Sequence, residues 1–546
     1  MRADVSGWQT RLTDQLIAEN TASGIWRNKT LADLLDTQLA RDPEQILIVD
    51  GDTKITARDI DAQSRALAGA LQQRGLVAGD VISFQLPNWR EAVVIDVAAA
   101  MLGLVCNPII PIYRDAEVAY ILKDAGTKVV FVPTEFRGFD YVAMIERHRG
   151  DLPDLQHVVT VREKVTGYMD FEGLLEDGAT AKLNRLTVDP NAVKLIMYTS
   201  GTTGRPKGVL HSHNTIDTEN QAFSGFLGLD QDDVILMPSP LTHITGYLYG
   251  IQLPIVLGAP VVFMESWNAA AAAELIDRHG VTFTIAATVF LQELTEFAGA
   301  HDRPLPSLRY FPCGGAPVPP EIIYNAHKTF ARCVCGRCYG STEAPTVTLG
   351  INTRAQEDFG ATTEGLIVGH EIKLVDENGE PVPLGIEGEI VTRGPEMCLG
   401  YADPAHNEAF DAQGYFHTGD LAILTEDDCL VITGRSKDLI IRGGENLSPR
   451  EVEDALHELP AVYEAAVVAM PHPRLGETGC AFVILKEGAS LSFDDMVSAL
   501  ETTGMAKQKY PERLEIVDAL PRTPAGKIRK NVLREQIAAM VAAEAK

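Results

Sequence analysis

The chain has 546 residues, of which 45% are hydrophobic, 22% charged and 7% aromatic. This composition is typical of a globular protein, and the length predicts two or more domains because single hydrophobic cores stop growing well below this size. The 75 acidic residues outnumber the 47 Lys and Arg residues, and the resulting net charge of −28 argues against nucleic acid and anionic membrane surfaces as partners.

The N-terminal stretch MRADVSGWQTRLTDQL has no apolar core of the kind that secretory signals carry. We therefore expect a cytoplasmic protein. The most membrane-like segment, residues 91–113, carries Asp96 and is interrupted by Asn107 and Pro108, so it falls short of a continuous spanning run. It predicts a buried helix followed by a strand, and no integral membrane association is expected.

Residues 45–330 alternate short β-rich runs with segments of helical periodicity. That alternation is typical of parallel sheets covered by helices and predicts an α/β fold. From about residue 365, glycine- and proline-punctuated β segments predict the hairpins of a small antiparallel or β-barrel-like subdomain. The expected N-terminal domain covers residues 1–434, with its β-barrel-like part at about 365–434.

A compact α+β domain is predicted for the remainder of the chain, residues 438–546. Its first helix is expected after Ser448, with Pro449 at the first helical position and Glu451 placed to complete a capping box. The pattern then predicts a strand at 462–470, a strand at 480–486, a helix at 493–501, a strand at 512–520 and a C-terminal helix.

Eight cysteines fit a reducing compartment, and three of them, Cys333, Cys335 and Cys338, lie close together in the sequence. On a strand, Cys333 and Cys335 share one face and Cys338 points away, so the three could converge on a metal only at a break in the strand. A structural role is therefore favoured, and a metal or redox site is the alternative.

A glycine- and hydroxyl-rich stretch, YTSGTTGRPKGV at residues 198–209, follows the apolar run AVKLIM. It is not a Walker loop, because Pro206 stands where that pattern requires glycine. Glycines still allow close backbone approach to a ligand, hydroxyls can donate to anionic oxygens, and Lys207 adds a mobile charge. The stretch predicts a phosphate-binding loop, the alternative being a turn that binds nothing.

The full stretch resembles the signature of the adenylate-forming superfamily, which includes acyl-CoA synthetases, peptide-synthetase adenylation domains and luciferases. Five further segments are similar to motifs of that family, in the family's order, so the resemblance covers residues from about 198 to 530. They are GGAP at 314–317, YGSTEA at 339–344, YFHTGD at 415–420, GRSKDLIIRGGENLSP at 434–449 and PRTPAGKIRK at 521–530.

The resemblance implies an ATP site. Tyr339 offers an aromatic face for adenine, Glu343 a carboxylate oxygen for Mg²⁺, and Thr342 a hydroxyl for the α-phosphate. Asp420 and Arg435 suit the ribose and its phosphate. The implied nucleotide contacts are Thr199, Ser200, Gly201, Thr202, Thr203, Gly204, Lys207, Gly314, Gly315, Ala316, Tyr339, Gly340, Ser341, Thr342, Asp420, Arg435 and Lys527. Metal ligands are expected at Thr199 and Glu343, and catalytic roles at Thr199, His243, Glu343 and Lys527.

Lys527 corresponds to the family's catalytic lysine. A carboxylate that attacks the α-phosphate of ATP brings like charges together, and one unit pair at about 4 Å costs roughly 4 kcal/mol at an effective dielectric near 20. A bridging cation removes that repulsion and stabilises the charged transition state. The resemblance also places a hinge at residues 435–437, centred on Lys437, about which a mobile C-terminal domain turns, and a CoA path along Gly443 and Gly444.

The acid itself is constrained by residues near the acyl site. The segment SPLTHITG at 239–246 carries histidine near the place where amino-acid-activating relatives tend to have aspartate, which disfavours an α-amino acid. His243, Ala287 and Thr288 are the expected acyl-pocket residues, and their small or apolar neighbours suit an uncharged acyl group. The alternative for His243 is a packed, hydrogen-bonded histidine. We expect a medium-chain, alicyclic or aromatic acid.

The predicted function is an ATP-dependent, AMP-forming acyl-CoA ligase, with ATP, Mg²⁺ and coenzyme A as its cofactors and co-substrates. The alternatives are an acyl-AMP ligase that loads a carrier protein, a luciferase-like oxygenase and a non-catalytic nucleotide-binding regulator on the same fold. The context of Lys527 also resembles sites that are acetylated in bacterial relatives, which implies an acetyltransferase and a deacetylase as partners. The oligomeric state is left open, a homodimer included.

Overall fold

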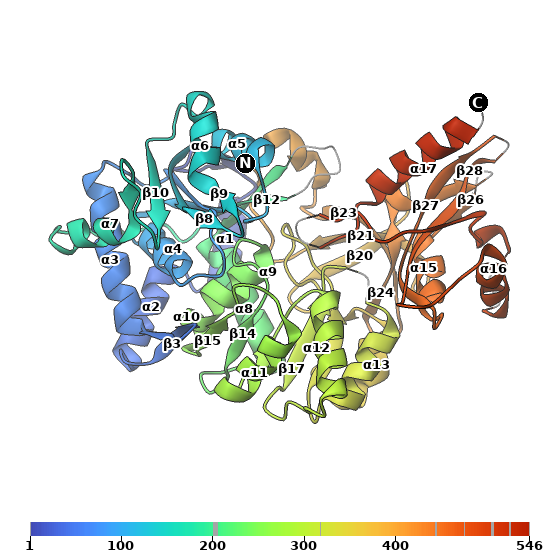
Figure 1. The fold of residues 1–546 in the computed structure, drawn as a ribbon. Helices are drawn as coiled ribbons and strands as arrows, with labels where there is room; N and C mark the ends of the chain where they lie inside the picture. The colour runs from blue at the N-terminus through green and yellow to red at the C-terminus, as the bar shows by residue number, and fades with distance from the viewer. Residues whose placement is uncertain are drawn as a thin grey trace.

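The computed structural model describes residues 2–199, 206–316, 318–442, 445–473, 475–503, 507–523 and 526–544. Two large sheets with helices packed around them form the N-terminal body, and the end of the chain forms a smaller body beside a five-stranded sheet built from residues 365–435 (Figure 1). The expected α/β fold with helix-covered sheets and a separate C-terminal α+β part is thereby confirmed.

The first sheet has eight strands and carries the glycine-rich stretch at one of its hairpins. Its strands run parallel from β11 to β12, and the last two pairings are antiparallel. In order across the sheet they are β11 (Met169–Asp170), β10 (His157–Val161), β7 (Thr127–Pro133), β5 (Val81–Phe84), β6 (Val105–Pro108), β12 (Val193–Thr199), β13 (Lys207–Ser212) and β22 (Gly400–Tyr401).

The second sheet has seven strands, which are parallel except for the β3–β4 hairpin. In order they are β18 (Val334–Cys338), β17 (Tyr310–Gly314), β16 (Phe283–Thr284), β14 (Ile235–Met237), β15 (Val261–Phe263), β3 (Ile46–Asp50) and β4 (Thr53–Thr56). Because β17 and β18 are parallel neighbours, the loops after them leave the same edge of the sheet, where α/β folds commonly bind ligands.

Helix α4 (Glu91–Leu102) lies in the main core, which also takes side chains from both sheets, and every one of its residues is buried. The expected buried helix and following strand, β6, are confirmed. Asp96 is tolerated there because its carboxylate accepts a 2.9 Å bond from Lys194 and a 2.6 Å bond from the Tyr247 hydroxyl. Among the described residues, the helices are all too short or too polar to cross a bilayer.

The other helices of the N-terminal part surround the two sheets (Figure 1). They are α1 (Asp14–Ala22), α2 (Leu31–Arg41), α3 (Ala57–Gln73), α5 (Asp115–Asp124), α6 (Tyr141–His148), α7 (Phe171–Ala179), α8 (His213–Leu227), α9 (Ile244–Gly246), α10 (Leu253–Leu257), α11 (Ala269–His279), α12 (Thr288–Ala300), α13 (Pro320–Thr329) and α14 (Glu357–Thr362).

The expected β-barrel-like subdomain is an open five-stranded antiparallel sheet. Its strands in order are β19 (Gly365–Leu366), β24 (Cys429–Arg435), β23 (Phe416–Leu424), β21 (Gly388–Arg393) and β20 (Glu371–Val375). Within the described part of the chain, no pairing joins β19 to β20 to close a barrel. The hairpins were correctly expected, whereas closure depends on strand tilt and stagger that local patterns do not reveal.

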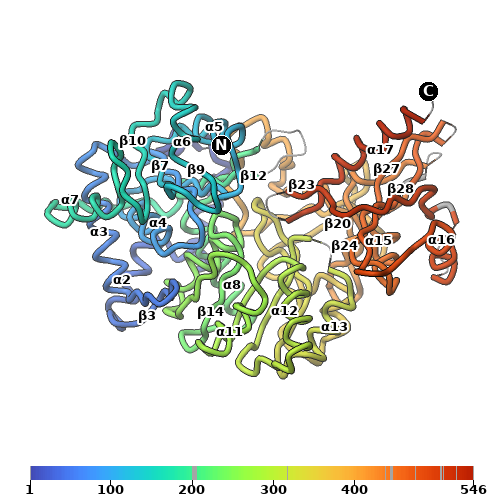
Figure 2. Tube along the Cα trace, in the orientation of Figure 1, coloured from blue at the N-terminus to red at the C-terminus, as the bar shows by residue number. Residues whose placement is uncertain are grey.

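The C-terminal part has its own sheet with helices on both faces (Figure 2). Alternate residues of β27 point to opposite faces: Val467 packs with α15 and α16, and Val468 packs with α17. The elements are β25 (Ile440–Arg442), β26 (Glu445–Leu447), α15 (Pro449–His457), β27 (Val462–His472), β28 (Gly476–Leu485), α16 (Phe493–Thr502), β29 (Arg513–Ile516) and α17 (Lys530–Glu544). The predicted order of elements is confirmed.

The capping box expected at α15 does not form. Ser448 precedes the helix and Pro449 begins it, but the Ser448 side chain makes no capping bond. Its hydroxyl donates instead to the carbonyl oxygen of Thr433, on β24, and Glu451 accepts a 2.6 Å bond from Lys509. A tertiary partner has thus replaced the local one, because the start of α15 packs against the five-stranded sheet.

Candidate functional site

Thr199 and Lys207 lie side by side at the base of the glycine-rich loop. Thr199 ends β12, Lys207 begins β13, and the two are paired across the antiparallel hairpin. The predicted loop residues Ser200, Gly201, Thr202, Thr203 and Gly204 lie outside the described residues. Gly208 faces packing rather than a ligand, since a Cβ there would lie 2.8 Å from the Cδ1 atom of Ile196.

Glu343 is connected to Lys207 through a tyrosine that stands in none of the predicted motifs. The hydroxyl of Tyr401, on β22, donates a 2.8 Å hydrogen bond to Oε1 of Glu343. The ammonium of Lys207 lies 5.6 Å from the centre of the Tyr401 ring, within the range of a cation–π contact. Strand pairing of β22 with β13 places Tyr401 there, a relationship between segments far apart in the sequence.

The predicted YGSTEA motif forms a tight loop directly after β18. The amide of Ser341 donates to the carbonyl of Ala344 at 2.9 Å, and a Cβ on Gly340 would lie 2.3 Å from the backbone nitrogen of Thr346. Glycine is therefore required at 340 by close backbone approach. The buried His211 contacts the carbonyl of Thr342 through Nε2 at 2.7 Å, which fixes the far side of the loop.

Tyr339, Asp420 and Arg435 form one hydrogen-bonded group. The Tyr339 hydroxyl donates to Oδ2 of Asp420 at 2.7 Å, and Nε of Arg435 lies 2.7 Å from Oδ1. Asp420 and Arg435 are paired across β23 and β24, whereas Tyr339 comes from the loop after β18. Burial raises the pKa of Tyr339, and Asp420 raises the pKa of Arg435, so the phenol and the guanidinium both stay protonated.

The GGAP segment follows β17 and lies beside the end of β18. Gly314 pairs with Cys338, and a Cβ on Gly314 would lie 2.4 Å from the Cys338 carbonyl oxygen. Gly315 has φ of +79°, a left-handed conformation that glycine adopts without strain. Ala316 comes next, and Pro317 lies outside the described residues. Two predicted nucleotide segments, 314–316 and 339–342, thus leave neighbouring parallel strands at the same edge.

Lys527 stands on a tight hairpin of the C-terminal part. Its carbonyl accepts a 2.7 Å bond from the Thr523 amide, and its own amide donates to the Thr523 hydroxyl at 3.1 Å. Burial lowers the pKa of the Lys527 ammonium, Arg435 lowers it further, and Asp420 and Glu343 oppose the shift. The structure therefore brings Lys527 near charged groups from residues 343, 420 and 435.

His243 adjoins the same region, because Lys527 also acts on its ionisation. His243 precedes α9, and its Nδ1 atom accepts from the Thr245 amide at 3.4 Å. Burial, followed by the nearby Lys527 charge, lowers the pKa of His243 to about 4. The imidazole is therefore neutral near pH 7, and it can accept or donate a hydrogen bond without adding a second cation to the site.

The two other expected acyl-pocket residues lie next to the GGAP segment. Ala287 is the residue before α12 and Thr288 is the first residue of that helix. Both are half-buried, and the preceding residue, Ala286, accepts a 3.3 Å bond from the Gly314 amide. The structure therefore places Ala287 and Thr288 beside the predicted nucleotide segment.

The expected hinge lies where the chain leaves β24. Lys437 belongs to the short 3₁₀ turn Ser436–Asp438, and its side chain lies outside the described residues, as do Gly443 and Gly444 entirely. On either side of Lys437, the Ser436 hydroxyl donates to the Gly419 carbonyl at 3.2 Å, and Arg534 donates to Asp438 at 2.9 Å. The turn is thus in contact with both parts of the protein.

The cysteine cluster has the strand geometry that was expected. Cys338 ends β18, which begins at Val334, and the Sγ atoms of Cys333 and Cys335 lie 3.6 Å apart. Burial raises the pKa values of Cys335 and Cys338, so both are thiols near pH 7. Over the described residues, no group of three or more His, Cys, Asp or Glu side chains is arranged to hold a metal ion.

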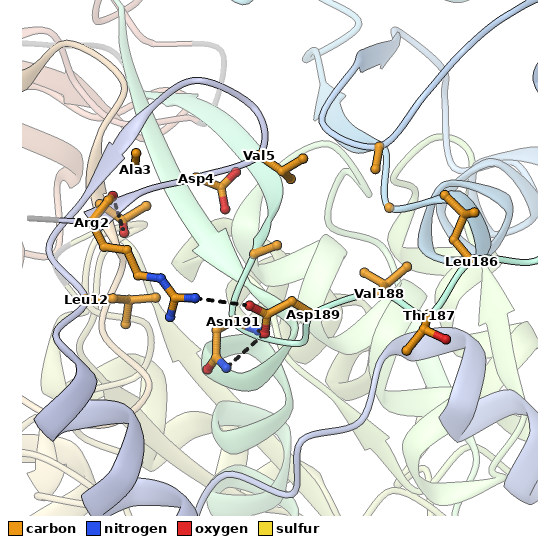
Figure 3. A pocket seen from close by; sticks show the side chains of 14 residues that line it. Arg2, Ala3, Asp4, Val5, Leu12, Leu186, Thr187, Val188, Asp189 and Asn191 are labelled. Carbon is orange, nitrogen blue, oxygen red and sulfur yellow. Dashed lines mark hydrogen bonds and ion pairs between the residues drawn. The ribbon is translucent and has the colours of Figure 1, made fainter.

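A cavity of about 310 Å³ lies away from these residues, between the N-terminal segment and residues 186–192 (Figure 3). Arg2 and Asp189 face each other across it at 3.7 Å, and the Asn191 amide donates to Asp189 at 3.0 Å. None of the predicted site residues lines this cavity. It is therefore separate from the cluster that Lys527 joins.

Two family models match the chain. The model described as AMP-binding enzyme matches residues 35–402, and the model described as AMP-binding enzyme C-terminal domain matches residues 451–527. These two ranges contain Glu343 and Lys527 respectively. They lie on either side of the predicted hinge at residues 435–437.

Similar proteins are found among both curated sequences and solved structures. The chain is 35% identical to a medium-chain fatty-acid–CoA ligase of Escherichia coli, over 96% of this chain and 93% of that protein. It is 32% identical to a salicylyl-CoA synthase/salicylate adenylyltransferase of a Streptomyces species, over 94% and 95%. The crystal structure of an anthranilate CoA ligase in complex with anthranoyl-AMP superposes with a TM-score of 0.84 at 26% identity, covering 94% of this chain and 98% of that one.

Proposed function

Since the chain belongs to the AMP-binding enzyme family, we propose that it joins a medium-chain, alicyclic or aromatic carboxylic acid to coenzyme A at the expense of ATP. The chain is an acid–thiol ligase of the AMP-forming class. In the first half-reaction a carboxylate oxygen attacks the α-phosphate of ATP, giving an acyl-adenylate and pyrophosphate. In the second, the thiol of CoA attacks the acyl carbon, AMP leaves, and the thiol proton is released.

One observation carries the proposal: Asp420 contacts Tyr339 and Arg435 at 2.7 Å each, and the charges of Arg435, Asp420 and Glu343 act on the pKa of Lys527, which comes from the other end of the chain. A flexible ammonium at this place can bridge the attacking carboxylate and the α-phosphate, two anions that otherwise repel each other. The lowered pKa makes the protonated form more costly in the absence of anions. Binding of the two anions therefore favours the protonated form.

The remaining nucleotide contacts are proposed from their placement. The edge formed by residues 314–316 and 339–342 would hold the adenine, with the Tyr339 ring as one face. Asp420 and Arg435 would hold the ribose, because Asp420 keeps further acceptor sites beyond the two bonds it makes. Thr199 and Lys207 stand at the base of the loop proposed to hold the phosphates.

Glu343 and Thr199 fit a magnesium ion. Mg²⁺ in nucleotide sites is commonly held by one or two protein oxygens together with phosphate oxygens and water. The Glu343 carboxylate, oriented by the Tyr401 hydroxyl, and the hydroxyl of Thr199 are oxygen donors of this kind. When bound, the ion would neutralise phosphate charge during the first half-reaction.

The second half-reaction supports the proposal of a hinge at residues 435–437, between domains of 1–434 and 438–546. With Lys527 in the site, its hairpin would occupy the approach to the acyl carbon, so a thiol would need that lysine withdrawn. Rotation about Lys437 would withdraw it, and Gly443 and Gly444 would then line the path of the CoA arm. The turn that holds Lys437 already contacts both parts of the chain.

The acid is proposed to be uncharged beyond its carboxylate. His243 is neutral near pH 7, and Ala287 and Thr288 beside the GGAP segment bring small side chains to the acyl end. These features support a medium-chain, alicyclic or aromatic acid over an amino acid, whose ammonium would need a carboxylate partner. A panel of carboxylic acids compared by kcat/KM tests this.

Two further elements complete the proposal, a cytoplasmic location and control by acetylation of Lys527, while the oligomeric state stays open, a homodimer included. Acetylation would remove the ammonium charge on which the first half-reaction depends. Mass spectrometry of the native protein and its activity after complete acetylation test the last element. Light scattering tests the assembly, and cell fractionation tests the location.

The deciding experiment measures the two half-reactions separately. Acid-dependent pyrophosphate release reports the first, and AMP release on addition of CoA reports the second. Release of both products supports the ligase. Pyrophosphate release without CoA turnover would favour a carrier-protein loading enzyme instead, and absence of both would favour a nucleotide-binding regulator.

A further inference from the structure

Glu364 is a buried carboxylate between the two parts of the chain, just before β19. Its side chain is 7% exposed. Oε2 accepts a 2.7 Å bond from the Ile432 amide of β24, which belongs to the five-stranded sheet. Oε1 accepts a 2.9 Å bond from Arg450, in the first turn of α15, and lies 3.6 Å from Arg337. Glu364 therefore receives donors from both sides of the predicted hinge.

Arg450 makes its shortest ion pair with Glu364. Its side chain is 11% exposed, and its only other carboxylate neighbour at ion-pair distance, within the described part of the chain, is Asp454 at 3.7 Å. The nearby Ser448 hydroxyl bonds the Thr433 carbonyl of β24, so the start of α15 makes two polar contacts with the N-terminal part. A buried ion pair at 2.9 Å is lost with a small displacement, and a rotation of the C-terminal part would separate it.

Such a pair acts on orientation more than on stability. Two buried charges lose hydration that their attraction only partly restores, so the net contribution to folding is small, whereas removal of one partner is costly. Orientations of the C-terminal part in which Arg450 has moved away and Glu364 stays buried are therefore higher in free energy. Arg337 moderates that penalty, because its guanidinium still faces Glu364 when Arg450 departs.

The backbone of Glu364 is connected by hydrogen bonds to Tyr339 in the candidate site. The Thr348 hydroxyl donates to the Glu364 carbonyl at 2.6 Å, and it accepts from the Tyr339 amide at 3.0 Å. The strand that supplies the Ile432 amide ends at Arg435, which pairs with Asp420. The residue that binds Arg450 is thus hydrogen-bonded to the segments that position Tyr339 and Arg435.

We propose that Glu364 and Arg450 form a latch that holds the C-terminal part in the orientation that brings Lys527 to the site, and so favours adenylation over thioester formation. Glu364 and Arg450 are positioning residues that act through Lys527. The inference rests on the proposed function. It assigns a role to two residues outside the motifs on which that function is based.

The test compares the two half-reactions in Glu364→Gln and Arg450→Gln. Adenylation, followed as acid-dependent pyrophosphate release, is expected to slow by about tenfold in each variant, because the adenylation orientation is less populated. Thioester formation from supplied acyl-adenylate and CoA should be unchanged or faster. Equal loss in both half-reactions, or an unchanged ratio, would overturn the latch.

Two controls separate this outcome from simple destabilisation. Glu544→Gln removes an exposed partner of Arg513 within the C-terminal part and should leave the ratio of the half-reactions unchanged. The double variant Glu364→Gln/Arg450→Gln should lose no more adenylation than either single variant, since both substitutions break one contact. Additive losses would overturn the proposal.

The wild-type protein distinguishes failure of the latch from failure of the proposed function. If the wild type carries out neither half-reaction, the proposed function has failed. If it carries out both and the variants keep its ratio, only the latch has failed. Arg450→Gln is expected to fold, because Arg337 remains beside Glu364, and its thermal unfolding temperature checks this.

Discussion

The hydroxyl of Tyr401 donates a 2.8 Å hydrogen bond to Oε1 of Glu343, while the Tyr401 ring lies 5.6 Å from the ammonium of Lys207. One side chain thus links the proposed metal-binding carboxylate to a proposed phosphate-binding lysine. Strand β22 places it by pairing with β13. Orientation of Glu343 therefore depends on a residue 58 positions further along the chain.

Tyr401→Phe keeps the ring beside Lys207 and removes only the hydrogen bond to Glu343. A hydrogen bond to a charged group is worth about 1.5–3 kcal/mol, so adenylation should slow by roughly tenfold, with a higher Mg²⁺ requirement. Pyrophosphate release measured over a Mg²⁺ titration checks both effects. Tyr415→Phe, which loses a bond to the exposed Glu371, is the matched control, and equal effects of the two would contradict the assignment.

Lys527→Ala should slow adenylation by about 10²-fold or more, because the repulsion between carboxylate and α-phosphate is no longer bridged. Conversion of supplied acyl-adenylate to acyl-CoA should be largely spared. Rapid-quench measurements of each half-reaction check this. Lys509→Ala, which removes an exposed partner of Glu451, is the control. Equal loss of both half-reactions by Lys527→Ala would refute its assignment to the first.

Lys437→Pro should stiffen the proposed hinge, because proline fixes φ of the turn residue. Thioester formation should fall more than adenylation, since only the second half-reaction requires the C-terminal part to leave its observed orientation. Lys437→Ala removes the same side chain but keeps backbone freedom, so it serves as the control. If both variants retain wild-type kinetics in both half-reactions, the hinge is not at this residue.

Glu219 should make folding stability depend on pH. It is fully buried, the Tyr249 hydroxyl donates to its Oε1 at 2.6 Å, and burial raises its pKa to about 7. Other groups also face it, because its charge acts on the pKa values of Glu396 and Cys338. Between the unfolded value near 4.3 and about 7, the folded state binds the proton that the unfolded state has lost.

The contribution of Glu219 to stability is therefore full below about pH 4 and falls as pH rises to about 7, by about 4 kcal/mol in total. Glu219→Gln should remove this dependence. Urea unfolding of wild type and variant at pH 5 and pH 8 measures the difference, and Glu371→Gln is the control because Arg393, partly offset by burial, lowers the pKa of Glu371. Parallel pH profiles for wild type and Glu219→Gln would show that Glu219 is not the responsible group.

Much of the fold could be predicted from local patterns. The apolar run at 91–102 predicted a helix that is wholly buried, and the alternation of runs along 45–330 predicted parallel sheets covered by helices, which the structure forms as two large, mainly parallel sheets. The capping box predicted at Ser448 was wrong. Ser448 has the spacing to Glu451 of a capping box, yet its hydroxyl bonds Thr433 because a packed neighbour offered a carbonyl there.

Some residues of the candidate site could be predicted from the sequence, and others could not. The motifs containing Tyr339, Asp420 and Lys527 were identified from the sequence, and the structure brings the three close together. Tyr401 and Glu364 were missed, since neither stands in a pattern that signals a ligand. Their importance lies in contacts with Glu343 and Arg450, which no local spacing reveals.

The sequence by itself determined the helices and strands, the order of the domains and the residue types available for chemistry, because periodicity and short motifs depend on near neighbours along the chain. Only the tertiary structure decided which of those side chains meet. Tyr401 reaches Glu343 across 58 positions and Arg450 reaches Glu364 across 86. Such contacts arise from strand pairing and from the docking of α15 against β24, whose geometry is fixed by the packing of the whole chain.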